Sequence, residues 1–125
     1  EFRSGILMND GNEAFTFVPL PEEAQYSPIQ ALHINDLDGD QVVDILAVGN
    51  FFDANIQMGR FDASYGTLLK GDGKGGFAPI SGKESGLKIQ GQCRNVNTVN
   101  MQDQEVILVG RNNDQPVFLL NNKTR

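Results

Sequence analysis

Four aspartates crowd into one short segment of the chain. Residues 35–44 carry Asp36, Asp38, Asp40 and Asp44 at positions 1, 3, 5 and 9 of a nine-residue loop. Two carboxylates about 4 Å apart repel by about 1 kcal/mol in water, and by several times more at a lower effective dielectric constant. Folding four of them together is therefore costly unless a cation lies between them.

The atoms that this loop offers to a cation are hard oxygens. Alternate residues of a curled loop point inward, and Gly39 lets the backbone bend without a Cβ clash. Ca²⁺ takes about six to eight oxygen ligands in a flexible geometry, whereas Mg²⁺ prefers fewer protein ligands. The loop has no His or Cys, which argues against Zn²⁺. We therefore expect Ca²⁺ as the cofactor, held by the four aspartates and the main-chain carbonyl of Val42 at position 7.

The same loop has two other interpretations, an EF-hand and a turn without a metal. An EF-hand requires Gly at position 6 and Glu at position 12, with a helix on each side. Here those positions are Gln41 and Ala47, and residues 45–48 are typical of a strand. The EF-hand interpretation therefore fails. The remaining alternative is an acidic, solvated turn that binds no metal.

The elements that must position this loop are short strands. Runs of β-branched and aliphatic residues alternate with turn-forming clusters of Asn, Asp and Gly, and 14 of the 125 residues are Gly. This pattern predicts an all-β chain, with one short helical turn at residues 21–25. The predicted strands are residues 5–8, 14–18, 31–34, 44–49, 66–69, 77–80, 105–109 and 117–120.

The chain also contains an internal repeat. Residues 6–15 align with residues 68–77 at an offset of 62 without a gap, and each copy has the pattern strand, Asp-Gly turn, strand. Residues 45–49 align with residues 106–110 at an offset of 61, and residues 119–121 begin a third copy at an offset of 51 from residue 68. Residues 51–65 have no counterpart and are interpreted as an insertion.

These motifs together resemble the FG-GAP/VCBS repeat family of β-propellers, of the integrin-α-like type. The resemblance rests on Asp-x-Asp-Gly-Asp-x-x-x-Asp at residues 36–44, the strand Ile-Leu-Ala-Val-Gly-Asn after it, and Gly-Asp-Gly-Lys-Gly-Gly-Phe at residues 71–77. It covers residues 27–80 and, weakly, the rest. It implies four-stranded antiparallel blades with the calcium loop between the first two strands. The implied ligands are Asp36, Asp38, Asp40, Val42 and Asp44.

The resemblance sets an expected domain organisation. Residues 1–125 form one partial propeller of two to two-and-a-half blades, with units at about 5–28 (partial), 29–80 (calcium loop) and 81–125 (degenerate). In the last unit two ligand positions are apolar, so we expect no metal there; the aligned residues are Asn97, Val99, Met101 and Glu105. Because a propeller closes with about four to eight blades, the chain is expected to be a C-terminal fragment or to associate through open blade edges.

Composition excludes several functions. Ten basic residues against 16 acidic ones give a net charge of −6, which argues against nucleic-acid and anionic-membrane partners. No apolar run is long enough to span a bilayer, and the single Cys93 excludes an intrachain disulfide. The only histidine, His33, is better explained as a strand residue than as a catalytic base. We identify no catalytic residues.

A second candidate surface lies in the insertion. Its aromatic, basic and acidic side chains could bind a carbohydrate or a protein, although packing between blades with Arg60 paired to Asp53 or Asp62 is the stronger interpretation. The residues concerned are Phe51, Phe52, Asp53, Arg60, Phe61, Asp62 and Tyr65.

The expected function is a calcium-binding, non-catalytic module for recognition or scaffolding, with a protein or carbohydrate partner. Weak calcium sites, with Kd about 10⁻⁴ to 10⁻³ M, are typical of extracellular modules, so a secreted, periplasmic or cell-surface location is expected. The alternative is a fragment of a sugar-active lyase or hydrolase whose active groups lie in blades outside this sequence.

Overall fold

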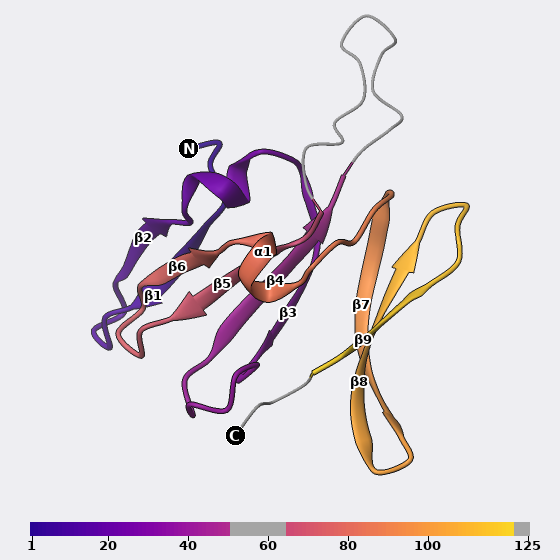
Figure 1. The fold of residues 1–125 in the computed structure, drawn as a ribbon. Coiled ribbons are helices and arrows are strands. Elements are labelled where there is room, and N and C mark those ends of the chain that lie inside the picture. Colours follow the sequence, from indigo (N-terminus) through magenta and orange to yellow (C-terminus); the bar gives the residue numbers. More distant parts are fainter. Residues whose placement is uncertain (51–64, 122–125) are drawn as a thin grey trace, which may run out of the picture.

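Three antiparallel sheets make up the described part of the protein. The computed structural model describes residues 1–50 and 65–121, and Figure 1 shows the sheets one beside the next. The first sheet is the hairpin of β1 (Gly5–Asn9) and β2 (Phe15–Pro19). A 3₁₀ turn, η1 (Glu22–Gln25), leads to the second sheet. The strands of the second sheet are β3 (Ile29–Asn35), β4 (Asp44–Gly49), β5 (Thr67–Gly71) and β6 (Phe77–Ile80).

The third sheet has three strands. After a single helical turn, α1 (Gly82–Ser85), come β7 (Cys93–Met101), β8 (Gln104–Arg111) and β9 (Val117–Leu120). The second and third sheets are both simple meanders, in which each strand pairs with its neighbours in sequence. Both helices in the described residues are too short to cross a membrane.

Strand β4 lies at the centre of the protein and is buried along its whole length. Its side chains alternate between two cores. Ile45 packs with Leu69 in the core next to the β1–β2 hairpin, whereas Leu46 and Val48 pack in the core next to the third sheet. A strand buried on both faces needs a continuous apolar run, and residues 45–48 are Ile-Leu-Ala-Val. The start of β4, at the end of the acidic loop, is thereby fixed in the protein interior.

The two Asp-Gly hairpins have the same structure. β1 pairs with β2 and β5 with β6 in the same register, so that Leu7↔Phe17 corresponds to Leu69↔Pro79. Each turn is closed by a backbone hydrogen bond of 3.0 Å, from the N–H of Asp10 in the first hairpin and from the N–H of Asp72 in the second. The predicted repeat at an offset of 62 is therefore confirmed.

The second alignment is wrong by one residue. In the second sheet, Ile45 of β4 pairs with Leu69 of β5 and packs towards the first sheet. In the third sheet, Ile107 of β8 pairs with Leu119 of β9 and packs towards the second sheet, so Ile107 corresponds to Ile45 and Leu119 to Leu69. The offset from β4 to β8 is therefore 62 rather than 61, and the offset from β5 to β9 is 50 rather than 51. A shift of one residue turns every side chain of a strand to the other face of the sheet. Both strands are runs of aliphatic residues, so the sequences also align at the incorrect offset.

The hairpin of the third sheet differs from that of the second. Asn97, Val99 and Met101 lie in β7 and Glu105 in β8, and the two strands continue to a two-residue turn. Gln102 and Asp103 have positive φ values of 51° and 63°, as a type I′ turn requires. The ladder therefore continues where the second sheet forms its acidic loop. That this unit binds no metal stays a prediction.

The prediction of an all-β chain with tight Asp-Gly hairpins is confirmed at the level of antiparallel sheets. All eight predicted strands are present, and the predicted helical turn is η1. Strand β7 and the turn α1 were missed. β7 is rich in Asn and has only every third or so side chain partly buried, so it lacks the apolar pattern of the other strands. The arrangement of these sheets as propeller blades stays a prediction.

Candidate metal centre

The acidic loop connects β3 to β4 at one end of the four-stranded sheet (Figure 1). Asn35 pairs with Asp44 at the end of the ladder, and the chain between them leaves the sheet. Two residues of this loop have positive φ, Gly39 at 88° and Gln41 at 70°. The glycine adopts this conformation at little cost, whereas at Gln41 it is held by the loop around it.

The aspartates of the loop fix its shape through the backbone. Asp36 accepts hydrogen bonds from the N–H of Gly39 (2.6 Å) and the N–H of Gln41 (3.1 Å). Asp38 accepts from the N–H of Asp40 (3.1 Å), and Asp40 accepts from the N–H of Val42 (2.8 Å). Because each carboxylate is held by an amide two to five residues further on, the loop curls around its own acidic side chains.

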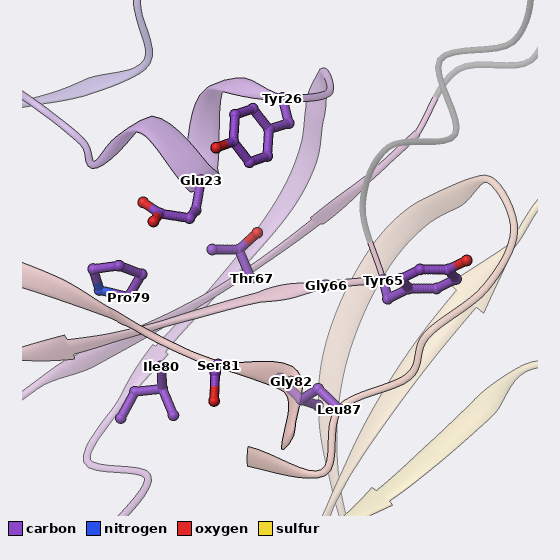
Figure 2. Close-up of a pocket in the computed structure, with 10 residues that line it drawn as sticks. All are labelled: Glu23, Tyr26, Tyr65, Gly66, Thr67, Pro79, Ile80, Ser81, Gly82 and Leu87. Atoms are coloured by element: carbon purple, nitrogen blue, oxygen red, sulfur yellow. The ribbon is translucent and has the colours of Figure 1, made fainter. Parts of the chain in front are cut away.

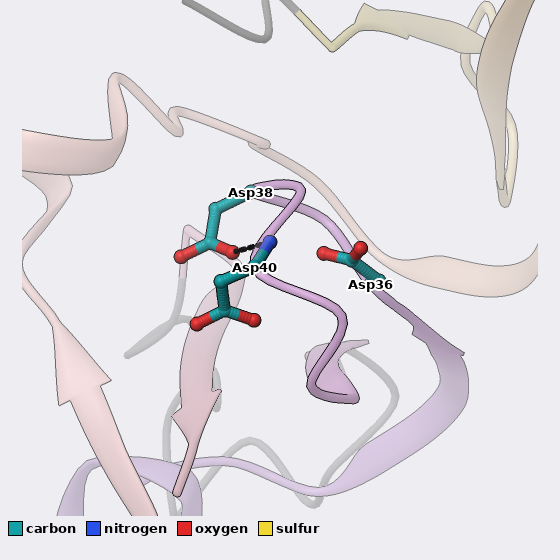
Figure 3. A group of neighbouring side chains, drawn as sticks. All are labelled: Asp36, Asp38 and Asp40. Carbon is teal, nitrogen blue, oxygen red and sulfur yellow. Dashed lines mark hydrogen bonds between the residues drawn. The ribbon is translucent and has the colours of Figure 1, made fainter. Parts of the chain in front are cut away.

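Three of the four predicted carboxylates lie together. One oxygen from each of Asp36, Asp38 and Asp40 lies within 4.8 Å of the others. Figure 3 shows Asp38 and Asp40 next to each other, with the carboxylate of Asp36 facing them across the loop. Asp36 is partly buried and the other two are exposed. This triad can hold a metal ion, and its all-oxygen donor set suits a hard cation.

The fourth predicted ligand, Asp44, is not one of the three aspartates whose oxygens lie within 4.8 Å of one another, and it is 2% exposed; its coordination of a metal stays a prediction. Its two oxygens accept hydrogen bonds from the N–H of Leu37 and the N–H of Gly71, both at 3.0 Å. Asp44 therefore joins the loop to strand β5. Of the fifth predicted ligand, Val42, the structure shows that its N–H donates to Asp40; coordination by its carbonyl stays a prediction.

A lysine missed in the sequence also belongs to the site. Lys70, in β5, forms ion pairs with Asp38 and, at 3.1 Å, with Asp40. The hydrogen bond from Lys70 holds the pKa of Asp38 below its usual range, and the bonds to Asp38 and Asp40 raise the pKa of Lys70. The internal repeat contained a signal for this role. Lys70 of the second hairpin corresponds to Met8 of the first, and in the described structure only the second hairpin lies beside an acidic loop.

The neighbouring sheet also contacts the loop. The side chain of Asn121 donates a hydrogen bond to the carbonyl of Leu37 (2.5 Å), and Asn35 donates to Glu105 (3.3 Å). These bonds cross between the second and third sheets. The position of the loop therefore depends on the packing of two sheets, and not on the β3–β4 hairpin alone.

The other residues considered in the sequence lie elsewhere. His33 is in β3, with its Nε2 buried and without a hydrogen-bond partner among the described residues. Cys93 is buried, and this burial raises the pKa of its thiol. Of the insertion, only Tyr65 is described. The remaining predicted residues, from Phe51 to Asp62, lie outside the described part of the chain.

No family model, no curated protein and no solved structure matches this chain. The interpretation of the acidic loop therefore depends on its own carboxylates, their backbone partners and Lys70.

Proposed function

We propose that this chain is a calcium-stabilised, non-catalytic module of a β-propeller of the FG-GAP/VCBS repeat type, serving extracellular recognition of a protein or carbohydrate. The observation that carries the proposal is the convergence of oxygens from Asp36, Asp38 and Asp40 within 4.8 Å, in a turn between two strands. Such a set of carboxylates, with a carbonyl close in sequence, suits the flexible oxygen coordination of Ca²⁺ better than the strict octahedron of Mg²⁺.

The packing of the sheets supports the propeller part of the proposal. Successive antiparallel meanders pack face to face, and the same hairpin recurs in the same register. In the second hairpin, Leu69 is fully buried in the core that also contains Ile6 of the first hairpin and Leu20 and Ala24 from the segment after it. Leu7 and Phe15, which correspond to Leu69 and Phe77 of the second hairpin, are 66% and 62% exposed. A further sheet packed on the β1–β2 hairpin would cover them, as the proposed architecture requires.

The proposed role of calcium is structural. The loop is joined to β5 through Asp44 and to the third sheet through Asn121, so an ion that rigidifies the loop stabilises the contact between sheets. A ligand present at about 100 times its Kd adds about 2.7 kcal/mol to the free energy of unfolding. Extracellular calcium concentrations would fill a weak site of this kind, which is why we infer an extracellular, periplasmic or surface location.

Thermal unfolding tests this proposal. We expect the thermal unfolding midpoint in millimolar Ca²⁺ to be roughly 10 °C higher than in EDTA, and the rise with Mg²⁺ to be smaller. Asp38→Ala should abolish the rise, whereas Asp10→Ala, in the first hairpin turn, should retain it. An unchanged midpoint at millimolar Ca²⁺ would show that Lys70 and the backbone amides are sufficient to neutralise the loop, and the calcium proposal would be wrong.

A further inference from the structure

A second site lies at the opposite end of the four-stranded sheet from the acidic loop. It is a cavity of about 370 Å³, shown in Figure 2, between η1, the start of β5 and the chain on either side of α1. This volume is in the range of small-ligand pockets, about 300 to 1,000 Å³. Strand β5 connects the two sites: Thr67, at its start, lines the cavity, and Lys70, near its end, reaches the acidic loop.

Five residues that line this cavity carry a carboxylate or a hydroxyl: Glu23, Tyr26, Tyr65, Thr67 and Ser81. In Figure 2 the ring of Tyr65 is directed away from the other four side chains. In Figure 2, Glu23 and Tyr26 project from the same helical turn, and the hydroxyl end of Tyr26 is turned to the side of Glu23. Within residues 1–50 and 65–121, no Lys, Arg or His lines the cavity. The carboxylate of Glu23 therefore repels anionic ligands, and the hydroxyls can both donate and accept hydrogen bonds.

The rest of the lining is apolar. Pro79, Ile80 and Leu87 contribute aliphatic surface, and Tyr26 and Tyr65 are 53% and 50% exposed. A half-exposed tyrosine offers a flat apolar face together with a polar tip. A ligand that matches this lining must have an apolar face, must donate to the carboxylate, and must both donate to and accept from the hydroxyls.

We propose that this cavity binds a neutral sugar. A pyranose ring has C–H faces for the ring of Tyr26 and the aliphatic wall, and hydroxyls around its edge for Glu23, Thr67 and Ser81. Phosphorylated sugars and uronates are disfavoured because Glu23 is the only charged residue among the described residues of the lining. An alkylammonium ion would satisfy Glu23, but it has no acceptor for the hydroxyls. The inference names a ligand for the recognition module proposed above, but it does not depend on calcium.

Intrinsic fluorescence gives a direct measurement of this binding. The chain has two tyrosines and no tryptophan, and both tyrosines line the cavity. We expect titration of the full chain with cellobiose, lactose or chitobiose to change the tyrosine emission saturably for at least one of them, with a Kd of about 1 mM. Digalacturonate should bind at least tenfold more weakly, and putrescine should leave the emission unchanged.

Matched variants separate the cavity from the surrounding surface. Glu23→Gln and Glu22→Gln alter neighbouring glutamates of η1, of which only Glu23 lines the cavity. Glu23→Gln should weaken sugar binding several-fold and remove the discrimination against digalacturonate, whereas Glu22→Gln should change neither. Tyr26→Phe keeps the ring and should weaken binding less than Tyr26→Ala, with Tyr65 emission as the readout. Isothermal titration calorimetry checks each variant by a second method.

Saturable binding of a neutral sugar that is weakened by Glu23→Gln supports the proposal. It is overturned if no neutral sugar changes the emission or the calorimetric heat, if digalacturonate or putrescine binds more tightly than the sugars, or if Glu22→Gln and Glu23→Gln have equal effects. Asp38→Ala should bind the sugar normally, so failure of the sugar site and failure of the calcium site are distinguishable.

Discussion

Asp44 accepts a hydrogen bond from the backbone N–H of Gly71 at 3.0 Å, which fastens the acidic loop to the end of strand β5. The two chain segments approach so closely that a Cβ at Gly71 would lie 2.1 Å from the carbonyl oxygen of Val43. A carboxylate that is almost completely buried, and a glycine next to it, therefore hold the base of the exposed triad. The following substitutions separate this support from metal binding itself.

Replacing Asp44 with Ala should destabilise the protein even without calcium. The N–H groups of Leu37 and Gly71 would lose a charged acceptor inside the protein, which costs roughly 2 to 4 kcal/mol in the free energy of unfolding. Urea denaturation in EDTA measures this loss, and Asp44→Asn, which keeps one acceptor oxygen, should lose less. If the variant and the wild type were equally stable in EDTA, Asp44 would act only through a metal ion.

Gly71→Ala should weaken the same junction by steric overlap. We expect a loss of about 1 to 3 kcal/mol, because the backbone at Val43 must move to accommodate the methyl group. Gly82→Ala is the matched control, since its Cβ would lie at an ordinary contact distance of 3.5 Å from Leu87. Chemical denaturation of both variants tests the contact; equal stability would contradict the close approach.

Lys70→Met should strengthen calcium binding. The ammonium group competes with a metal ion for oxygens of Asp38 and Asp40, and methionine is the residue at the corresponding position of the first hairpin. We expect a Kd for Ca²⁺ that is a few-fold lower, measured by isothermal titration calorimetry. In EDTA the variant should be slightly less stable, because the carboxylates then repel without a counter-charge. Unchanged or weaker affinity would mean that Lys70 does not share the metal-binding oxygens.

The turn of the second hairpin should make stability depend on pH. Hydrogen bonds from the N–H groups of Lys74 and Gly76 lower the pKa of Asp72. A carboxyl group with a lowered folded-state pKa stabilises the protein above its unfolded pKa of about 3.9, and this contribution is lost as the pH falls through the folded value.

Asp72→Asn should therefore be less stable than the wild type at neutral pH, and the difference should shrink as the pH falls below about 4. Thermal unfolding between neutral and acidic pH measures this, with Asp103→Asn in the β7–β8 turn as the control. A difference that is constant across this range would show that the ionised form of Asp72 has no special role.

The exposed face of the first hairpin should cause self-association. Leu7 and Phe15 are 66% and 62% exposed on the face that corresponds to the buried face of β5 and β6. We expect the isolated chain to associate with increasing concentration, and Leu7→Lys to reduce this association without loss of stability. Light scattering checks both. A wild-type chain that stays monomeric at high concentration would contradict the prediction.

The local pattern of the sequence was sufficient for the strands that carry an apolar face and for the two Asp-Gly hairpins. Strand β4 and its burial follow from Ile-Leu-Ala-Val, and the acidic spacing at residues 36, 38 and 40 predicts the cluster that the loop forms. These features depend on residues close together in the sequence. Over so short a range, the types of the side chains restrict the backbone conformation and determine which side chains point into the core.

Only the tertiary structure decided which carboxylates meet and what faces them. Asp44, at the start of buried β4, accepts hydrogen bonds from amides of the loop and of β5, and Lys70 reaches the triad from β5. The spacing of the aspartates specifies neither contact. The correct offset of 62 between β4 and β8, one residue more than the sequences suggest, likewise follows only from their pairing with β5 and β9. Contacts between distant segments depend on strand register and sheet packing, which similar runs of aliphatic residues do not specify.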